Sequence, residues 1–289
     1  MGEVPGLLVM NILITGAGGF IGSHLSKVLA REHKTYLVFS GLKAVGKPES
    51  ISVDLTDKSL VYKRFSDLSK QVNIDAMFHL ASCMASPDQT ENVELLHDNI
   101  AITESIITIA KLFKPSVLIN CSSMAVYPNI SGTFSENSGP APQKNPDCLY
   151  GLSKYCTEVI IDFLLRKESI RIVHLRISQV HGEGMQEDRV IPVMLKELQE
   201  NNTITVYGDG ERTSNFIEVS KLTKELQFFL NNDVTGVYNI GDQNISYVEL
   251  AQTLIEQHGD NNSVINKKPQ GNKEKYILDT SKLNAINKS

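Results

Sequence analysis

The sequence predicts an α/β protein, a doubly wound parallel sheet with a smaller, interleaved α/β lobe in its carboxyl-terminal part. Three observations lead to this fold class. Short apolar runs alternate with amphipathic stretches at the spacing of βαβ units. These runs are apolar at nearly every position, as is typical of strands that helices cover on both faces. The glycine-rich segment GAGGFIG, residues 16–22, directly follows the first run.

Predicted strands and helices alternate over the first two thirds of the chain. The strands are expected at Leu8–Thr15, Thr35–Phe39, Ile51–Val53, Ala76–Leu80, Val117–Cys121 and Ile172–Ile177. The helices are expected at Gly19–Arg31, Asp57–Lys70, Asn99–Phe113 and Leu149–Lys167.

After Ser178 the pattern changes. Gly182 and Gly184 open a loop, a helix is expected after Pro192, and short strands surround residues 206–219. We therefore assign residues 10–178, with a return segment at about 214–240, to a dinucleotide-binding domain. The remaining segments, 179–213 and 241–289, are assigned to a substrate-binding lobe.

Composition narrows the classes of partner. The chain has 289 residues, 41% of them hydrophobic, and a net charge of -5 without a long basic run. This charge predicts neither nucleic acid nor an anionic membrane as a partner. No apolar run reaches the ~18 residues that a membrane-spanning helix needs, and no secretory signal is recognisable, so we expect a cytoplasmic protein. The four cysteines form no CxxC pair and no cluster with histidine, which predicts neither a metal site nor a disulfide.

The glycine-rich segment lies between the end of a strand and the first turn of a helix. Gly16, Gly19 and Gly22 are spaced three apart. Such glycines permit a tight turn and let main-chain N–H groups approach a diphosphate. A glycine-rich turn without a ligand is the alternative, but the strand before it and the helix after it favour a dinucleotide.

The end of the second strand is the place where NAD-binding and NADP-binding proteins usually differ. An acidic residue ~20 positions after the glycines usually binds the adenosine ribose. Here the strand ends at Ser40, with Lys43 nearby and no carboxylate at the tip, which also suits a 2′-phosphate. The cofactor is therefore NAD or NADP. Asp54, followed by Leu55, is predicted to contact the adenine, or else to cap the next helix.

Tyr150 and Lys154 lie four residues apart near a predicted helix start, so both side chains share one face. A phenol with a pKa of ~10 is a poor base at neutral pH, and a neighbouring ammonium favours the phenolate. Ser122 and Ser123 emerge where the strand that ends at Cys121 meets the carboxyl edge of the sheet. Ser123 is expected to bond the substrate oxygen. When Tyr150 and Lys154 are considered without Ser123, the alternative is a non-catalytic, exposed tyrosine beside a solvated lysine.

Seven segments occur in order over nearly the whole chain: TGAGGFIG (15–22), FHLAS (78–82), SSMAVY (122–127), YGLSK (150–154), LRISQVHGEG (175–184), VYGDGERTSNFIEV (206–219) and VYNIG (237–241). In this set and order the sequence resembles the extended short-chain dehydrogenases/reductases that modify nucleotide sugars, such as UDP-glucose 4-epimerase. The resemblance implies a Rossmann domain with a small substrate lobe. It also implies a nucleotide-activated sugar as substrate and a homodimer formed through the helices at 99–113 and 149–167.

The resemblance also implies roles for single residues. Thr15 to Gly22 would bind the cofactor diphosphate, and Asn99 would take a structural and proton-relay position. Together with the residues derived above, the predicted cofactor-binding set is Gly16, Gly18, Gly19, Phe20, Ile21, Gly22, Ser40, Lys43, Asp54, Leu55, Leu80, Ala81, Ser82, Asn99, Tyr150, Lys154 and Ile177. The catalytic set is Ser123, Tyr150 and Lys154. The substrate-binding set is Ser122, Ser123, Gln179 and Arg212.

The chain departs from the family pattern at three places. Met124 and Ala125 stand where dehydratases carry Asp-Glu, so a 4,6-dehydratase is disfavoured. Ser214 stands where an arginine usually clamps the substrate diphosphate, and Arg212, on the same strand face, is the expected replacement. Gln179 replaces the usual asparagine and keeps an amide.

Three functions remain open at this point. The first is a 4-epimerase, in which Tyr150 removes the C4 hydroxyl proton and hydride passes to NAD and returns to the other face of a 4-keto sugar. The second is an NADPH-dependent reductase of a nucleotide-4-keto-6-deoxy sugar, which the Ser40 tip favours. The third is a non-catalytic dinucleotide-binding sensor.

Overall fold

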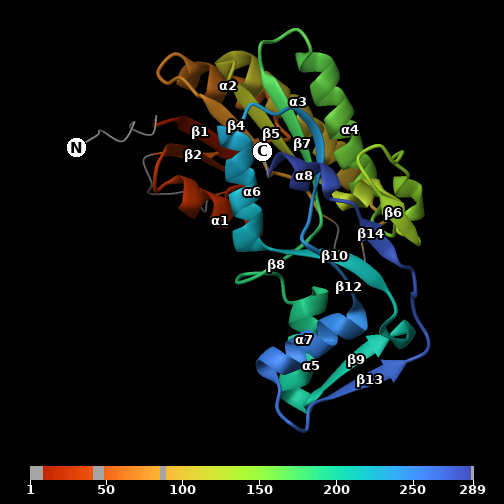
Figure 1. Cartoon of the computed structure of the whole chain (residues 1–289). Helices are drawn as coiled ribbons and strands as arrows, with labels where there is room; N and C mark the ends of the chain where they lie inside the picture. The colour runs from red at the N-terminus through yellow and green to blue at the C-terminus, as the bar shows by residue number, and fades with distance from the viewer. Residues whose placement is uncertain (1–8, 42–48, 85–88, 288–289) are drawn as a thin grey trace.

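The computed structural model describes residues 9–41, 49–84 and 89–287. Figure 1 shows a large layered part that contains both described ends of the chain, with a smaller lobe attached at one side of it. Leu8 and Lys43 lie outside the described residues.

Seven parallel strands form the large sheet in the order β11-β7-β5-β4-β1-β2-β3. They are β1 (Asn11–Thr15), β2 (Lys34–Phe39), β3 (Ser50–Ser52), β4 (Ala76–His79), β5 (Val117–Ser123), β7 (Arg171–Ile177) and β11 (Gly236–Ile240). The chain runs outward from β1 to β3 and then returns to β4 on the other side of β1. The switch point at which such sheets bind ligands therefore lies at the carboxyl ends of β1 and β4. The prediction of a doubly wound Rossmann sheet is confirmed.

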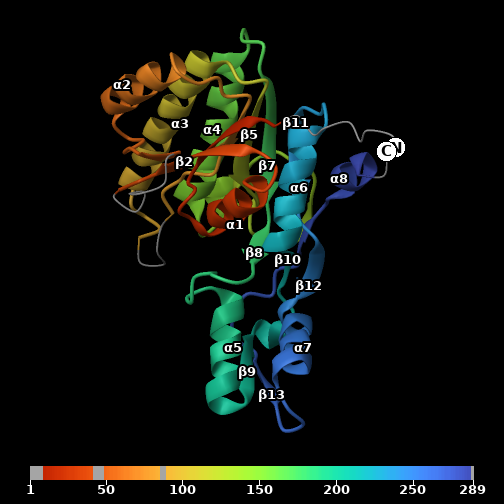
Figure 2. The ribbon, with the colours of Figure 1, turned by 90° about the vertical axis from the view of Figure 1, so that its left-hand side faces the viewer.

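Helices cover both faces of this sheet, as Figure 2 shows. One face carries α1 (Phe20–Leu29) and α6 (Val219–Asn231), and the other carries α2 (Lys58–Ser69), α3 (Glu94–Phe113) and α4 (Cys148–Leu165). Alternate residues of one strand enter opposite cores: Ile12 and Ile14 pack toward α1, and Leu13 packs toward α2 and α3. Both sets are buried, which explains why the strands read as unbroken apolar runs.

The smaller lobe has a core of its own. Helices α5 (Val190–Asn201) and α7 (Tyr247–His258) pack on the parallel pair β9 (Thr203–Tyr207) and β13 (Val264–Lys268), around residues such as Met194. A three-stranded sheet joins the lobe to the large sheet. Its strands are β8 (Gln179–His181), β10 (Thr213–Glu218) and β12 (Gln243–Ser246), with β10 in the middle.

The end of the chain returns to the large part. Strand β14 (Tyr276–Leu278) pairs with β6 (Gly132–Phe134), and α8 (Ser281–Ile286) lies against β11. Tyr276 stacks on Phe134, which in turn stacks on Tyr127. The expected boundary placed all of residues 241–289 in the substrate lobe, but β14 and α8 bury their apolar side chains against the sheet domain.

Several predicted boundaries were wrong for local reasons. Helix α3 begins at Glu94, whose N–H bonds the Asn92 side chain, so Asn99 lies in the second turn and does not open the helix. Helix α5 begins at Val190, with Pro192 in its first turn, where a missing N–H costs no helix bond. Strand β5 extends to Ser123 because it keeps pairing with β7 there.

Helix α2 is capped by Asp57, whose carboxylate accepts from the N–H of Leu60. The capping alternative for Asp54 is therefore wrong. None of the helices in the described ranges is long and apolar enough to span a lipid bilayer.

Gly22→Ala is expected to destabilise the protein. A Cβ at residue 22 would lie 2.1 Å from the carbonyl oxygen of Gly16, and a backbone oxygen cannot rotate away. We expect a net loss of about 1–3 kcal/mol in the free energy of unfolding, measured by urea denaturation. Gly139→Ala is the control, because a Cβ there meets no described atom within 4 Å. Equal effects of the two changes would contradict this packing.

Candidate active site

The turn after β1 owes two of its glycines to contacts within the protein. Gly16 has φ 71°, and a Cβ there would lie 2.6 Å from the backbone nitrogen of Ala81. Gly22 faces the carbonyl of Gly16, as described above. These contacts draw the ends of β1 and β4 together with the start of α1. The close approach that the sequence pattern indicates is thus, at these two positions, an approach of backbone to backbone.

The other two glycines of the turn, Gly18 and Gly19, are exposed. Gly19 is the N-cap of α1. Because glycine has no side chain, it does not cap the first N–H groups of the helix, those of Phe20 and Ile21. An uncapped helix start that follows a parallel strand is suited to a diphosphate. A side chain at Gly18 would also crowd the ring of Phe39, at 3.1 Å. The residues present therefore fit a dinucleotide.

The tips of β2 and β3 lie on the far side of β1 from β4. Ser40 is exposed, and Gly41 beside it accepts a hydrogen bond from Ser52. No carboxylate lies at Ser40 or Gly41. Asp54 is exposed and accepts from the N–H and the hydroxyl of Thr56 at 2.9 and 2.8 Å, while Leu55 is buried in the core.

The segment after β4 contains Leu80, Ala81 and Ser82, all partly exposed. The N–H of Leu80 donates to the carbonyl of Thr15, which joins this segment to the glycine turn. Asn99 secures its far end: the amide accepts from the N–H of Cys83 at 2.8 Å and donates to the Cys83 carbonyl at 2.9 Å. These contacts account for a structural role of Asn99. Neither of them is to Tyr150 or Lys154.

Helix α4 reaches the end of β5 through a glycine that the sequence analysis did not single out. Gly151 lies so close to the short helix η2 (Met124–Val126) that a Cβ would be 2.1 Å from the carbonyl oxygen of Ala125. Ser123 is the N-cap of η2 and accepts from the N–H of Ala125 at 3.1 Å. Tyr150 precedes Gly151 directly, so this contact brings Tyr150 and Ser123 into one neighbourhood. The glycine in YGLSK was the available sequence signal.

Lys154 is buried, with 5% of its surface exposed. Its ammonium donates to the carbonyl of Cys121 at 3.0 Å and lies 5.6 Å from the centre of the Tyr150 ring. Among the described residues no carboxylate approaches Lys154 within 4.0 Å. Tyr150 itself is partly exposed. The arrangement places an unpaired cation beside an accessible phenol.

Ser122 is buried, although the sequence analysis placed it in the substrate-binding set. Only 4% of it is exposed, and its hydroxyl donates to the carboxylate of Glu158 at 2.5 Å. Successive side chains of a strand point to opposite faces, so Ser122 and Ser123 cannot both face the same ligand. We withdraw Ser122 from the substrate-binding set and keep Ser123. Ile177, the last residue of β7, pairs with Ser123 and is buried beside it.

The expected substrate-binding residues of the lobe lie apart from one another. Gln179 donates its amide to the hydroxyl of Ser214 at 2.8 Å. Arg212 precedes β10, and its guanidinium lies 5.3 Å from the ring centre of Tyr247. Arg212 and Tyr247 line a hollow of about 790 Å³ between α5, β9 and the start of α7. Four carboxylates also line this hollow: Glu187, Asp188, Glu197 and Glu200. The cations that line it are Lys196 and Arg212.

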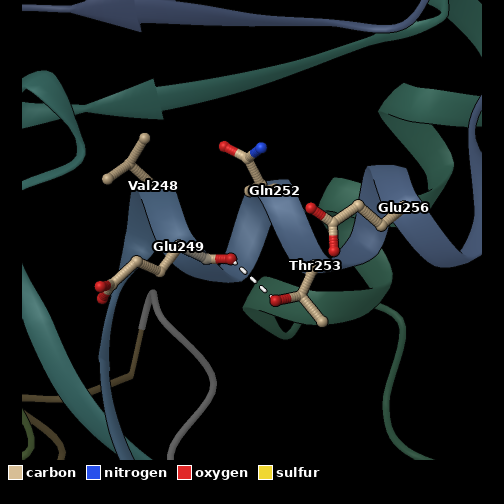
Figure 3. A pocket seen from close by; sticks show the side chains of 5 residues that line it. All are labelled: Val248, Glu249, Gln252, Thr253 and Glu256. Carbon is tan, nitrogen blue, oxygen red and sulfur yellow. Dashed lines mark hydrogen bonds between the residues drawn. The ribbon is translucent and has the colours of Figure 1, made fainter. Parts of the chain in front are cut away.

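A second, shallower hollow follows α7 alone, and Figure 3 shows its five side chains on that helix. Thr253 donates to the carbonyl of Glu249, whose carboxylate bonds Ser246. The side chains of Thr253 and Glu249 thus form hydrogen bonds within α7 and at its N-cap. No group of three or more His, Cys, Asp or Glu side chains in the described parts of the chain is placed to hold a metal ion.

Comparison with known proteins agrees with this geometry. The NAD dependent epimerase/dehydratase family model matches residues 12–241. The chain is 27% identical to a putative UDP-glucose 4-epimerase of Methanocaldococcus jannaschii over 95% of this chain and 92% of the relative. It is 24% identical to human dTDP-D-glucose 4,6-dehydratase over 98% and 86%. A third relative, dTDP-D-glucose 4,6-dehydratase of Dictyostelium discoideum, is 23% identical over 88% of this chain and 64% of its own length.

Among solved structures, UDP-N-acetylglucosamine 4-epimerase from Methanobrevibacter ruminantium superposes with a TM-score of 0.81 at 23% identity, over 97% of this chain and 92% of that one. At this identity the likeness establishes the fold. The family match extends from β1 to the residue after β11 and so includes both the glycine turn and the Tyr-Lys pair. The chain therefore belongs to the NAD dependent epimerase/dehydratase family, whose description names NAD as the cofactor.

Proposed function

We propose that this chain is a nucleotide-sugar 4-epimerase, which inverts C4 of a hexose through a 4-keto intermediate. The observation that carries the proposal is the buried, unpaired ammonium of Lys154 beside the accessible Tyr150, with Ser123 at the end of the adjacent strand. A cation in a poorly hydrated place favours the anionic form of a neighbouring phenol. Family membership supports a sugar nucleotide as the substrate class.

In the proposed reaction each residue handles a proton or an oxygen. NAD, when bound, supplies hydride acceptance and return at C4. Tyr150 accepts the proton of the C4 hydroxyl and gives it back when the carbonyl is reduced. Lys154 favours the anionic state of that phenol before it accepts the proton, and the phenol is neutral while the 4-keto sugar exists. Ser123 donates a hydrogen bond to the C4 oxygen.

Elimination of water is not supported by the residues that follow Ser123. A 4,6-dehydratase needs a general acid and a general base beside the sugar. The two positions hold Met124 and Ala125, and neither side chain can exchange a proton. This difference favours epimerisation over dehydration, although dehydratases occur among the relatives.

The diphosphate of the substrate is proposed to lie near Arg212. Its guanidinium lies 5.3 Å from the ring centre of Tyr247 and lines the hollow of about 790 Å³, while the Gln179 amide donates to the Ser214 hydroxyl. An arginine can bind two oxygens of a diphosphate at once. The relatives' names supply a panel of test substrates: UDP-glucose, UDP-N-acetylglucosamine, UDP-glucuronic acid and dTDP-glucose.

Tyr150→Phe separates an enzyme from a non-catalytic dinucleotide-binding sensor. Removal of the phenolic oxygen should lower kcat for C4 epimerisation by about 100-fold or more, the usual contribution of a general acid or base. NAD binding, measured by calorimetric titration, should remain. Tyr155→Phe, one turn later on α4, is the control and should retain activity. A sugar turnover that survives Tyr150→Phe would contradict the catalytic assignment.

One observation favours a second function, an NADPH-dependent 4-keto-sugar reductase: the exposed tip of β2 has a serine, Ser40, in place of a ribose-binding carboxylate. The absorbance spectrum of the purified protein and titration with both cofactors distinguish the two functions. An epimerase returns its hydride, so it should carry NAD through purification and bind it more tightly than NADP. An empty protein that prefers NADPH would support the reductase and contradict the epimerase.

A homodimer is proposed through helix α4. Val159, Phe163 and Leu164 are 48%, 60% and 41% exposed and lie on one side of that helix. Light scattering should give a dimer for the unchanged protein and a monomer for Phe163→Asp. Tyr62→Asp, on α2 and 59% exposed, is the matched control and should leave the dimer intact. A monomeric unchanged protein would exclude the interface.

A further inference from the structure

A buried ion pair lies one helical turn below Lys154. Glu158 and Arg176 are 3% and 4% exposed, and the carboxylate accepts from Nε and Nη2 of Arg176 at 3.1 and 2.7 Å. Glu158 also accepts from Ser122. The remaining terminal nitrogen of Arg176 donates to the hydroxyl of Tyr127 at 2.9 Å. One residue of α4 is thus bound to both β5 and β7.

Glu158 of this pair lies on the same face of α4 as the proposed catalytic residues. Tyr150, Lys154 and Glu158 follow one another at four-residue steps and share one face of α4. Glu158 is therefore the carboxylate of this helix face that stands nearest to Lys154. Arg176 compensates the charge of Glu158, and the Lys154 ammonium has no carboxylate within 4.0 Å among the described residues.

Two titratable side chains that feel the charge of Lys154, His79 and Cys121, have pKa values that favour their neutral forms at neutral pH. Burial and the charge of Lys154 lower the pKa of His79, on β4, to about 3, and burial raises the pKa of the Cys121 thiol, on β5, to about 12. On the α3 side Cys83 has its pKa raised by burial and by Asp98.

Further charges lie at the ends of the helix or in solvent. His174 of β7 bonds Asp162 of α4, whose side chain is 60% exposed. Lys144 of η3 (Pro142–Lys144) and Asp147, the N-cap of α4, are exposed at its start. Water screens Asp162, Lys144 and Asp147, whereas His174 is itself buried, with 1% of its side chain exposed.

We propose that Arg176 is a positioning residue that neutralises Glu158, so that the positive charge of Lys154 acts on Tyr150 and sets the pH at which the enzyme works. The proposal rests on the function proposed above. Neither member of the pair needs to touch the sugar or NAD. Arg176 acts through Glu158, and Glu158 acts through its charge at Lys154.

The two charges should shift the pH–rate profile in opposite directions. Arg176→Gln leaves the Glu158 carboxylate near Lys154 and disfavours the phenolate, so the midpoint of kcat against pH moves up. Glu158→Gln leaves Arg176 uncompensated and moves the midpoint down. Tyr150 lies eight residues, roughly 12 Å, from Glu158, and a charge at that distance in a protein interior corresponds to about one pH unit. The double variant Glu158→Gln/Arg176→Gln should return to the original midpoint.

The experiment measures kcat against pH for these three variants, with UDP-glucose or the most rapidly converted sugar of the panel. Asp162→Asn is the matched control: it removes a carboxylate from the same helix at an exposed place and should leave the midpoint unchanged. Phenolate absorbance of the protein without sugar, compared with Tyr150→Phe at each pH, gives a second readout that needs no turnover.

Opposite shifts that cancel in the double variant support the proposal. Shifts in the same direction, or reduced stability with no shift, would overturn it and leave the pair a structural role only. If both single variants fail to fold, the double variant decides, because a displaced midpoint contradicts the proposal. The two proposals fail in different ways: an inactive unchanged protein refutes the epimerase, whereas an active one with an immovable midpoint refutes only the role of the pair.

Discussion

The fold depends on close backbone–backbone contacts at three glycines, where a side chain would not fit. Gly16 against Ala81, Gly22 against Gly16 and Gly151 against Ala125 leave no room for a Cβ. Each contact joins a helix start or a turn to the carboxyl end of a parallel strand. Together they gather the first turn of α1, the segment after β4 and the start of α4 at one edge of the sheet. Main-chain amides and a few polar side chains are thereby concentrated at the switch point.

Burial of charge is the second organising constraint at this edge. Lys154 lies in the interior against a single carbonyl, and Glu158 and Arg176 form a closed pair one turn away. Isolated buried charges are unfavourable unless they are paired or hydrogen-bonded, and the ammonium of Lys154 is hydrogen-bonded to the Cys121 carbonyl. Glu158 ties α4 to Ser122 of β5 and to Arg176 of β7 through hydrogen bonds.

The lobe is where this chain differs most from the pattern of its family. The usual arginine is Ser214, which bonds Gln179, and Arg212 faces a hollow that is lined by more carboxylates than cations. A strongly anionic ligand would therefore gain less from this lobe than from a basic one.

Much of the sheet domain was predictable because its signals are local. The apolar runs, the spacing of the glycines and the four-residue step from Tyr150 to Lys154 all lie within one or two elements. Element ends were less accurate, since capping depends on which nearby side chain reaches the free N–H groups. Asp57 was thus mistaken for a helix residue while it caps α2, and Asn99 was placed at a helix start that lies five residues earlier.

The sequence by itself determined the class of the sheet and the place of the glycine turn, and it proposed the set Ser123, Tyr150 and Lys154. Only the tertiary structure decided that Ser122 turns inward to Glu158, that Gly151 brings α4 against Ala125, and that residues 276–286 return to the large sheet. The reason is the range of the contacts. A periodic pattern reports the face on which a side chain lies, whereas its partner comes from an element that is distant in sequence and becomes a neighbour only when the chain has folded.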